Sequence, residues 1–134
     1  MIKGRHINIL VVEDDFTHYL LIMEYLAPLG FTLIRVTNDV ETWSILMKNN
    51  IHLILMDVKL KNSKINGIEL SREIKAFFPL LPIIIQTAFV DRINGIDLMK
   101  EVYDDYITKP YEMGKFTNKV LTILNKHNNK IAIQ

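Results

Sequence analysis

The run Ile51-His52-Leu53-Ile54-Leu55-Met56-Asp57 is almost wholly apolar and ends in a carboxylate. A second run, Ile7-Asn8-Ile9-Leu10-Val11-Val12, ends in Glu13-Asp14-Asp15. Parallel strands buried on both faces have such continuous apolar sequences, and in open α/β sheets the ligand site lies beyond the carboxyl ends of the strands. Two strands that both end in carboxylates therefore predict one acidic site at that edge of a sheet.

The whole chain alternates between short apolar runs and segments with helical spacing, the pattern of a parallel sheet covered by helices. Five strands are predicted, at residues 7–12, 31–37, 51–58, 83–87 and 105–108. If every crossover is right-handed and the chain reverses direction once, the first and third strands lie side by side and the strand order is 2-1-3-4-5. We therefore predict an α/β fold, a doubly wound (βα)5 sandwich around one five-stranded parallel sheet.

A helix is predicted after each strand, and apolar spacing indicates its buried face. Asn38 is placed to cap the second helix. The fourth would be capped by Asp91, and its interior Gly95 costs roughly 1 kcal/mol relative to alanine. The last helix is predicted at 111–126. The helical positions expected in the core are Phe16, Tyr19, Leu20, Met23 and Leu26 in the first helix and Val40, Trp43, Leu46 and Met47 in the second.

The composition is that of one globular domain, with 134 residues, 49% of them hydrophobic and 23% charged. We predict this domain at 7–126, with a leader at 1–6 and a tail at 127–134. The net charge of +1 favours neither nucleic acid nor an anionic membrane, and the lack of cysteine excludes a disulfide scaffold and a thiolate site. No apolar run is long enough for a membrane span, so we expect a cytoplasmic protein without direct nucleic-acid binding.

Five polar residues are expected to converge at the carboxyl edge of the sheet: Glu13, Asp14, Asp57, Thr87 and Lys109. Three carboxylates this close repel one another unless a cation neutralises them, and hard oxygen ligands favour Mg²⁺. A carboxylate beside such a metal can act as a nucleophile and form an aspartyl phosphate. Thr87 could then donate a hydrogen bond to a phosphoryl oxygen, and Lys109 could supply compensating positive charge.

Between residue 7 and about residue 126, the chain resembles the response-regulator receiver domains of two-component signalling, which have a flavodoxin-like fold. Five stretches carry the resemblance in order: Ile-Leu-Val-Val-Glu-Asp-Asp (9–15), Leu-Ile-Leu-Met-Asp (53–57), Asn-Gly-Ile-Glu-Leu (66–70), Pro-Ile-Ile-Ile-Gln-Thr-Ala (82–88) and Asp-Asp-Tyr-Ile-Thr-Lys-Pro (104–110). The resemblance implies that Asp57 is phosphorylated. It also implies that Glu13 and Asp14 bind Mg²⁺, with Mn²⁺ as the alternative ion, and that the Lys59 backbone carbonyl is a further ligand.

By the same resemblance, Thr87 and Lys109 bind the phosphoryl group, Tyr106 changes rotamer together with Thr87, and the Lys109–Pro110 bond is cis. The implied partners are a sensor histidine kinase or phosphotransfer domain and an unknown downstream protein. The implied readout surface consists of the fourth helix, fifth strand and fifth helix, through which homodimers can also form. The domain would be free-standing or part of a hybrid histidine kinase, and would react only in its own phosphorylation and dephosphorylation.

The loop after Asp57 departs from the family pattern. Gly67 lies two residues further from Asp57 than in most relatives, and Leu60-Lys61 stands where relatives carry Met-Pro. The loop at 59–66 is rich in lysine, which is typical of a solvated surface. The alternative hypothesis is that Lys59 approaches the phosphoryl group or guides an acidic partner.

Other interpretations stay open. Phe89 could overhang the site and shield the acyl phosphate from water, or simply pack. A phosphohydrolase with Asp57 as nucleophile would need a second acid two residues on, where Lys59 stands. An interaction domain that keeps the fold without phosphorylation is a third reading. The four histidines have no spacing typical of a metal site or relay, and we assign them no role.

Overall fold

A computed structural model describes residues 6–88 and 102–133 of the chain. Five parallel strands form one sheet in the order β2-β1-β3-β4-β5, as predicted. The strands are β1 (Asn8–Val12), β2 (Thr32–Val36), β3 (Leu53–Asp57), β4 (Ile83–Thr87) and β5 (Asp105–Thr108). The last two have the predicted bounds, and the first three are shorter than predicted at their ends.

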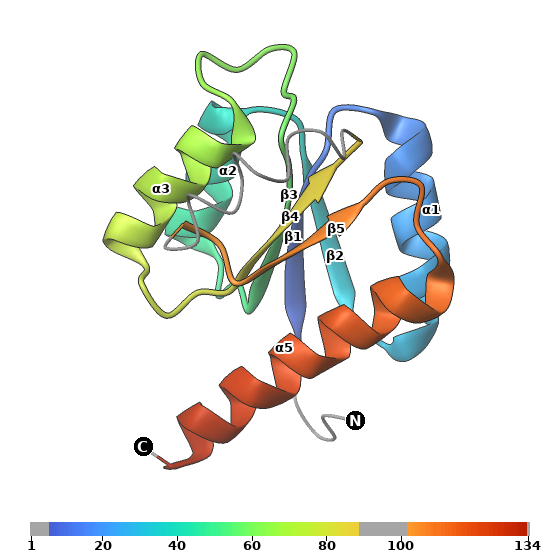
Figure 1. Ribbon diagram of the computed structural model, residues 1–134. Helices are drawn as coiled ribbons and strands as arrows, with labels where there is room; N and C mark the ends of the chain where they lie inside the picture. The colour runs from blue at the N-terminus through green and yellow to red at the C-terminus, as the bar shows by residue number, and fades with distance from the viewer. Residues whose placement is uncertain (1–5, 89–101, 134) are drawn as a thin grey trace.

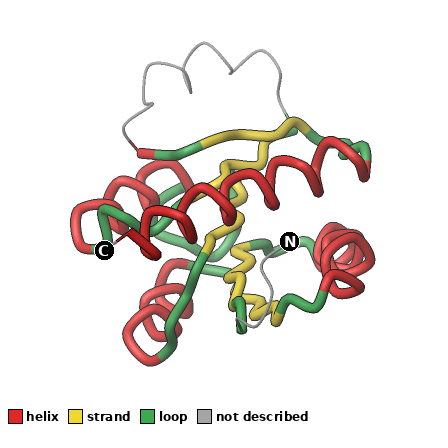
Figure 2. The backbone as a smooth tube through the Cα atoms, turned by 90° about the horizontal axis from the view of Figure 1, so that it is seen from below, coloured by secondary structure: helices red, strands yellow, loops and turns green. Residues whose placement is uncertain are grey.

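Helices cover both faces of this sheet. They are α1 (Phe16–Leu26), which continues as a short 3-10 turn η1 (Ala27–Leu29), α2 (Asp39–Lys48), α3 (Gly67–Phe77) and α5 (Met113–Ile133). Figure 1 shows α1 and α5 on one side of the strands and α2 and α3 on the other, and Figure 2 shows the layers from below. The predicted fourth helix, with Asp91 and Gly95, lies outside the described residues.

The two faces of the sheet make two separate cores. Because side chains alternate along a strand, one set points toward α1 and α5 and the next toward α2 and α3. The strand residues of the first core are Ile9, Val11, Leu53, Leu55, Ile84 and Ile107. Those of the second are Leu10, Val12, Val36, Ile54, Met56, Ile83 and Ile85. Central strands buried on both faces explain the continuous apolar runs.

Local signals in the sequence set the helix starts. Asp15, Asn38 and Asn66 are the N-caps of α1, α2 and α3, and each accepts hydrogen bonds from backbone N–H groups of the first turn. The predicted cap at Asn38 is therefore confirmed. Gly30 follows η1 with a φ of 89°, a left-handed conformation that glycine adopts without strain.

The predicted buried face of α1 is wrong in part. Phe16, Leu20 and Met23 are exposed, whereas Ile22 and Leu26 are fully buried against the sheet. Apolar residues lie on more than one side of this helix, so their spacing does not select a face, and packing against the sheet does.

The predictions for α2 and α5 also need correction. In α2, Leu46 is buried as expected, but Val40 and Met47 are exposed. Trp43 is half-buried and meets the ring of Phe77 edge-on at 5.5 Å. The last helix begins at Met113 rather than at residue 111. It runs to Ile133 rather than to residue 126, because residues 127–133 contain no glycine or proline to stop it. Among the described residues, no helix combines the length and apolar character needed to cross a bilayer.

Gly67 sits where the backbone passes close to the end of β3. Its N–H donates to the Val58 carbonyl at 2.8 Å, and a Cβ at this position would overlap the carbonyl of Asp57. A side chain at residue 67 would therefore push α3 away from Asp57.

We expect Gly67→Ala to lower the free energy of unfolding by roughly 1–3 kcal/mol, the usual cost of overpacking a tight site. Urea denaturation measures this. Gly114→Ala is the matched control, because a Cβ there has its nearest neighbour at 3.9 Å, and alanine in a helix is favoured by up to about 1 kcal/mol. Equal midpoints for Gly67→Ala and the wild type would contradict the overlap.

Candidate functional site

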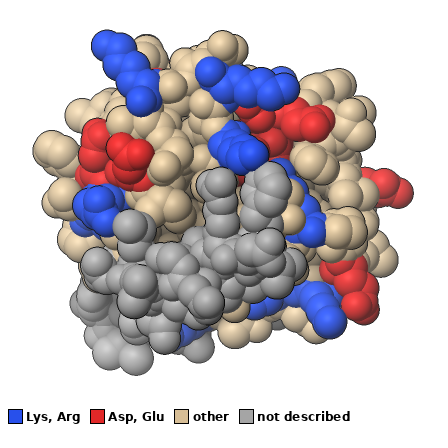
Figure 3. All heavy atoms as spheres, turned by 45° about the horizontal axis from the view of Figure 1, so that its top comes forward, with Lys and Arg blue, Asp and Glu red and all other residues tan. Residues whose placement is uncertain are grey.

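Three carboxylates meet at the carboxyl edge of the sheet. Glu13 and Asp14 directly follow β1, and Asp57 ends β3, the neighbouring strand. One oxygen from each lies within 4.8 Å of the other two. The space-filling view of this edge shows acidic side chains next to basic ones (Figure 3). The structure thus brings together the three acids that the sequence placed at one edge.

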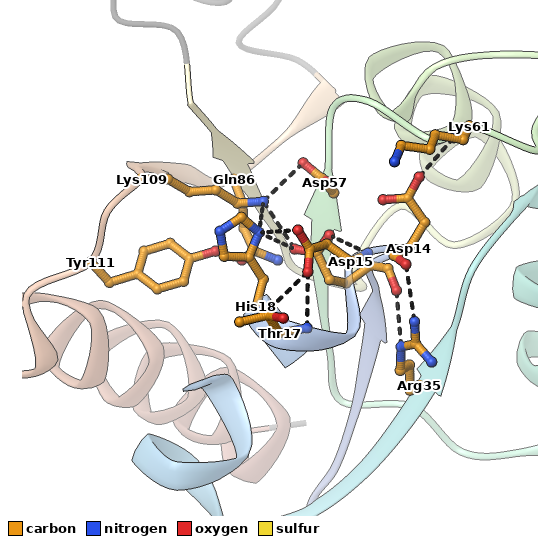
Figure 4. Close-up of polar contacts among 11 residues, drawn as sticks. Asp14, Asp15, Thr17, His18, Arg35, Asp57, Lys61, Gln86, Lys109 and Tyr111 are labelled. Carbon is orange, nitrogen blue, oxygen red and sulfur yellow. Dashed lines mark hydrogen bonds and ion pairs between the residues drawn. The ribbon is translucent and has the colours of Figure 1, made fainter. Parts of the chain in front are cut away.

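Lys109, in the turn after β5, supplies the positive charge. Its Nζ lies 2.9 Å from Glu13 Oε1 and 3.4 Å from Asp57 Oδ1, and its side chain is only 8% exposed. Figure 4 shows the ammonium group between Asp57 and the ring of His18. The backbone N–H of Lys109 donates to the Thr87 carbonyl at 2.7 Å, which ties the turn to β4. The Lys109–Pro110 bond is cis, as the resemblance implied.

Hydrogen bonds hold the acidic loop in place. The fully buried Glu13 accepts at Oε2 from the Asp15 backbone N–H at 3.2 Å. Arg35, on β2, donates to the backbone carbonyls of Glu13 and Asp14, each at 3.1 Å. Its guanidinium also lies 5.2 Å from the centre of the Phe16 ring. Arg35 therefore links the edge strand to the loop that carries two of the three acids.

The loop at 58–66 is anchored to the acidic site. The Lys61 backbone N–H donates to Asp14 Oδ2 at 2.8 Å, and the Asp39 backbone N–H donates to Ser63 Oγ at 2.9 Å. Leu60 is buried in the core beside α3. The three lysines of the loop, Lys59, Lys61 and Lys64, are exposed. The extended loop is thus packed against the core at Leu60, while its three lysines are on the surface.

The protonation of Asp57 reflects its burial. The side chain is nearly inaccessible, and the pKa of its carboxyl is raised to about 7. Burial is the largest cause, and the hydrogen bond with Glu13 and the negative charge of Glu13 act in the same direction. The positive charge of Lys109 opposes them. An ionised Asp57 is therefore destabilised until more positive charge enters the site.

Asp14 and Asp57 line a cleft of about 200 Å³, whereas Glu13 is buried behind them and is not part of the lining. Its lining residues are Asp14, Asp15, His18, Asp57, Val58, Lys59, Lys61, Thr87, Ala88 and Lys109. Thr87 is buried, with 2% exposure. Tyr106 does not line the cleft and packs edge-on against Tyr103 at 6.2 Å. Phe89 lies outside the described residues, so its shielding role stays a prediction, as does the Lys59 carbonyl as a ligand.

His18 is a site residue that sequence reasoning missed. Its Nδ1 lies 3.3 Å from Lys109 Nζ. The same nitrogen lies 3.6 Å from Asp15 Oδ2 and 3.9 Å from Glu13 Oε1, so the ring stands between Lys109 and two acids. No second histidine lies at a spacing typical of a site, and the contact of His18 with Lys109 joins residues 91 positions apart. Its position three residues after the α1 N-cap Asp15 was the available signal.

The donor set fits a small hard cation. Carboxylate oxygens from Glu13, Asp14 and Asp57 are close enough together to share one ion, and the chain has no cysteine. Mg²⁺ prefers a few carboxylates with several waters, and the open cleft leaves room for those waters.

Comparisons with known proteins agree on one family. A family model described as "Response regulator receiver domain" matches residues 9–121. The chain is 28% identical over 113 residues to the transcriptional regulatory protein ZraR of Klebsiella oxytoca, covering 84% of this chain and 25% of ZraR. It is 31% identical over 120 residues to the transcriptional regulatory protein RprY of Bacteroides fragilis, covering 90% of this chain and 50% of RprY.

A solved structure with the same fold is the response regulator protein TrrA of Thermotoga maritima, determined in complex with Mg²⁺-BeF. It superposes with a TM-score of 0.78 at 26% identity, covering 87% of this chain and 98% of TrrA. The chain spans about a quarter of the length of ZraR and half that of RprY.

In metal-free buffer, we expect Asp57→Asn to be more stable than the wild type at pH 8. The pKa of Asp57 is raised from 3.8 to about 7, so folding takes up a proton between these values, and stability falls as the pH rises through them. This shift corresponds to at most about 4 kcal/mol. Urea denaturation with a chelator at pH 8 and pH 5 measures the difference, which should shrink at the lower pH. A difference independent of pH would contradict the raised pKa.

Proposed function

The chain belongs to the response regulator receiver domain family of two-component systems, and on that premise we propose that it is a phosphoacceptor switch. Asp57 accepts a phosphoryl group from the phosphohistidine of a sensor histidine kinase or phosphotransfer domain. The observation that carries this proposal is the placement of Asp57 at the end of a central strand, facing an open cleft, beside two further acids and Lys109.

In the transfer, an Asp57 carboxylate oxygen attacks phosphorus and the phosphorus–nitrogen bond of phosphohistidine breaks. The electron pair of that bond goes to the leaving imidazole, which takes up a proton from solvent. The acyl phosphate later loses its phosphoryl group to water, which restores the carboxylate. The chain therefore acts only on itself.

Glu13, Asp14, Asp57 and the Lys59 backbone carbonyl would hold Mg²⁺, with Mn²⁺ as the alternative ion. When bound, the ion neutralises charge on the carboxylates and on the transferring phosphoryl oxygens. The spacing of the three acids supports this ligand set, and the related protein TrrA binds Mg²⁺-BeF. To reach the ion, Asp14 would exchange or share its hydrogen bond with the Lys61 backbone N–H.

Lys109 and Thr87 would respond to the new phosphate. A phosphoryl group adds about −1.5 to −2 charges. Lys109 Nζ lies close enough to Asp57 to pair with a phosphoryl oxygen, and Thr87 lines the cleft, from which its hydroxyl would donate a hydrogen bond. Tyr106 would change its packing as Thr87 moves. This would alter the surface formed by the fourth helix, β5 and α5, where a downstream protein or a second copy of the chain would bind.

We expect intact mass spectrometry to show a gain of one phosphate when the protein is treated with a small phosphodonor such as acetyl phosphate and Mg²⁺. The gain should be lost with a chelator and in Asp57→Asn, since metal and nucleophile are both needed. Asp39→Asn is the matched control, because Asp39 lies in the first turn of α2, outside both the acidic cluster and the cleft lining.

Three outcomes would contradict the proposal. Unchanged mass of the folded wild type would favour an interaction domain without phosphorylation. Repeated turnover of phosphate esters, in place of one stoichiometric transfer, would favour a phosphohydrolase. Phosphorylation of Asp57→Asn to the wild-type level would place the phosphate elsewhere.

A further inference from the structure

A buried polar pair lies next to the lining residues Asp57 and Lys109 but is not itself part of the cleft lining. The Tyr111 hydroxyl donates a hydrogen bond to Gln86 Oε1. Gln86 is fully buried in β4, and Tyr111 is 8% exposed. Figure 4 shows both side chains close to Lys109.

Gln86 is adjacent to Asp57 in the sheet. The two residues are register partners on β4 and β3. They point to the same face, since Gln86 follows Ile84 by two positions and Asp57 follows Leu55 by two, and both apolar residues pack in the core beside α1 and α5. The amide of Gln86 therefore lies on the same side of the sheet as the reacting carboxylate.

Tyr111 belongs to the turn that carries Lys109. This turn is tied to β4 at two neighbouring residues: the Lys109 backbone N–H donates to the Thr87 carbonyl, and the Tyr111 hydroxyl donates to Gln86. The Tyr111 ring also stacks on Phe116 of α5, with ring centres 4.9 Å apart. The position of the Lys109 backbone thus depends on how Tyr111 is held.

Burying this polar pair costs folding free energy, so stability by itself does not explain why these two side chains are here. Burial raises the pKa of the Tyr111 hydroxyl, and the negative charges of Glu13 and Asp57 raise it further, so the group stays a protonated donor. Gln86 Nε2 has no hydrogen-bond partner among the described residues, and an unpaired buried donor costs free energy. Phenylalanine and leucine at these positions would avoid that cost.

We propose that the Tyr111–Gln86 hydrogen bond positions Lys109. It holds the turn against β4 so that the ammonium group stays within reach of both Glu13 and Asp57. Gln86 and Tyr111 are positioning residues, because they act through Lys109 and do not line the cleft. This inference deepens the proposed function, on which its first readout rests.

The first test compares Tyr111→Phe with the double variant Tyr111→Phe/Gln86→Leu. The single variant leaves the Gln86 amide without its partner and should unfold at lower urea. The double variant removes both polar groups and should recover wild-type stability. If the pair positions Lys109, the rate of phosphorylation by acetyl phosphate should stay about tenfold reduced in both. Recovery of the rate together with stability would show a purely structural role and overturn the proposal.

Tyr25→Phe is the matched control, because Tyr25 contacts Phe116 in the same aromatic cluster but is not in the Lys109 turn. Its phosphorylation rate should equal that of the wild type. An equal slowing by Tyr25→Phe would assign the effect to the cluster as a whole and also overturn the proposal.

The second readout does not depend on phosphorylation. Lys109→Met is made in the wild type and in the double variant, and the four urea midpoints form a cycle. Lys109 should contribute less to stability in the double variant, because its ammonium is no longer held between the acids. Additive effects would overturn the positioning role. If the wild type takes up no phosphate but the effects of Lys109→Met and the double variant are not additive, the proposed function is contradicted and the positioning role is supported.

Discussion

One ammonium group, Lys109 Nζ, is shared by two buried carboxylates, and the rest of the site is built around that constraint. Glu13 is fully buried and Asp57 nearly so, and charged groups out of water need a partner of opposite sign. Burial is the largest cause of the raised pKa of Asp57, and the negative charge of Glu13 adds to it, because Lys109 supplies only one positive charge to the cluster. A divalent cation is the addition that this imbalance favours, because it brings positive charge to the carboxylates.

The fold could be predicted from the sequence because its central strands are buried on both faces. The apolar runs locate the strands, and the rule of right-handed crossovers then predicts their order. The polar residues that end or follow these strands are the five expected at the carboxyl edge of the sheet. Helix faces were harder, because α1 is apolar on more than one side and only packing on the sheet selects Ile22 and Leu26 over Phe16 and Leu20. From the sequence, a tail is expected at 127–134, but α5 continues to Ile133 because no glycine or proline stops it.

Within the site, the sequence indicated the residues that end strands but not those that support them. Arg35 and the Tyr111–Gln86 pair act on partners far away in the chain, so no local spacing predicts them. The spacing of Asp57 and Gly67 indicates that the lysine-rich loop is longer than in most receiver domains. The hydrogen bond that anchors it, from the Lys61 backbone N–H to Asp14, is visible only in the folded chain. Whether Lys59 approaches the phosphoryl group stays a prediction.

The location of the phosphate tests the central claim most directly. The protein is treated with acetyl phosphate and Mg²⁺, reduced with borohydride, which converts an aspartyl phosphate to homoserine, and digested for peptide sequencing by mass spectrometry. We predict homoserine at position 57 and unmodified acids at Glu13, Asp14 and Asp15. Homoserine in place of another acid would contradict the assignment of Asp57 as the phosphoacceptor. The assignment would also be contradicted if the intact mass shows one added phosphate but no homoserine is found.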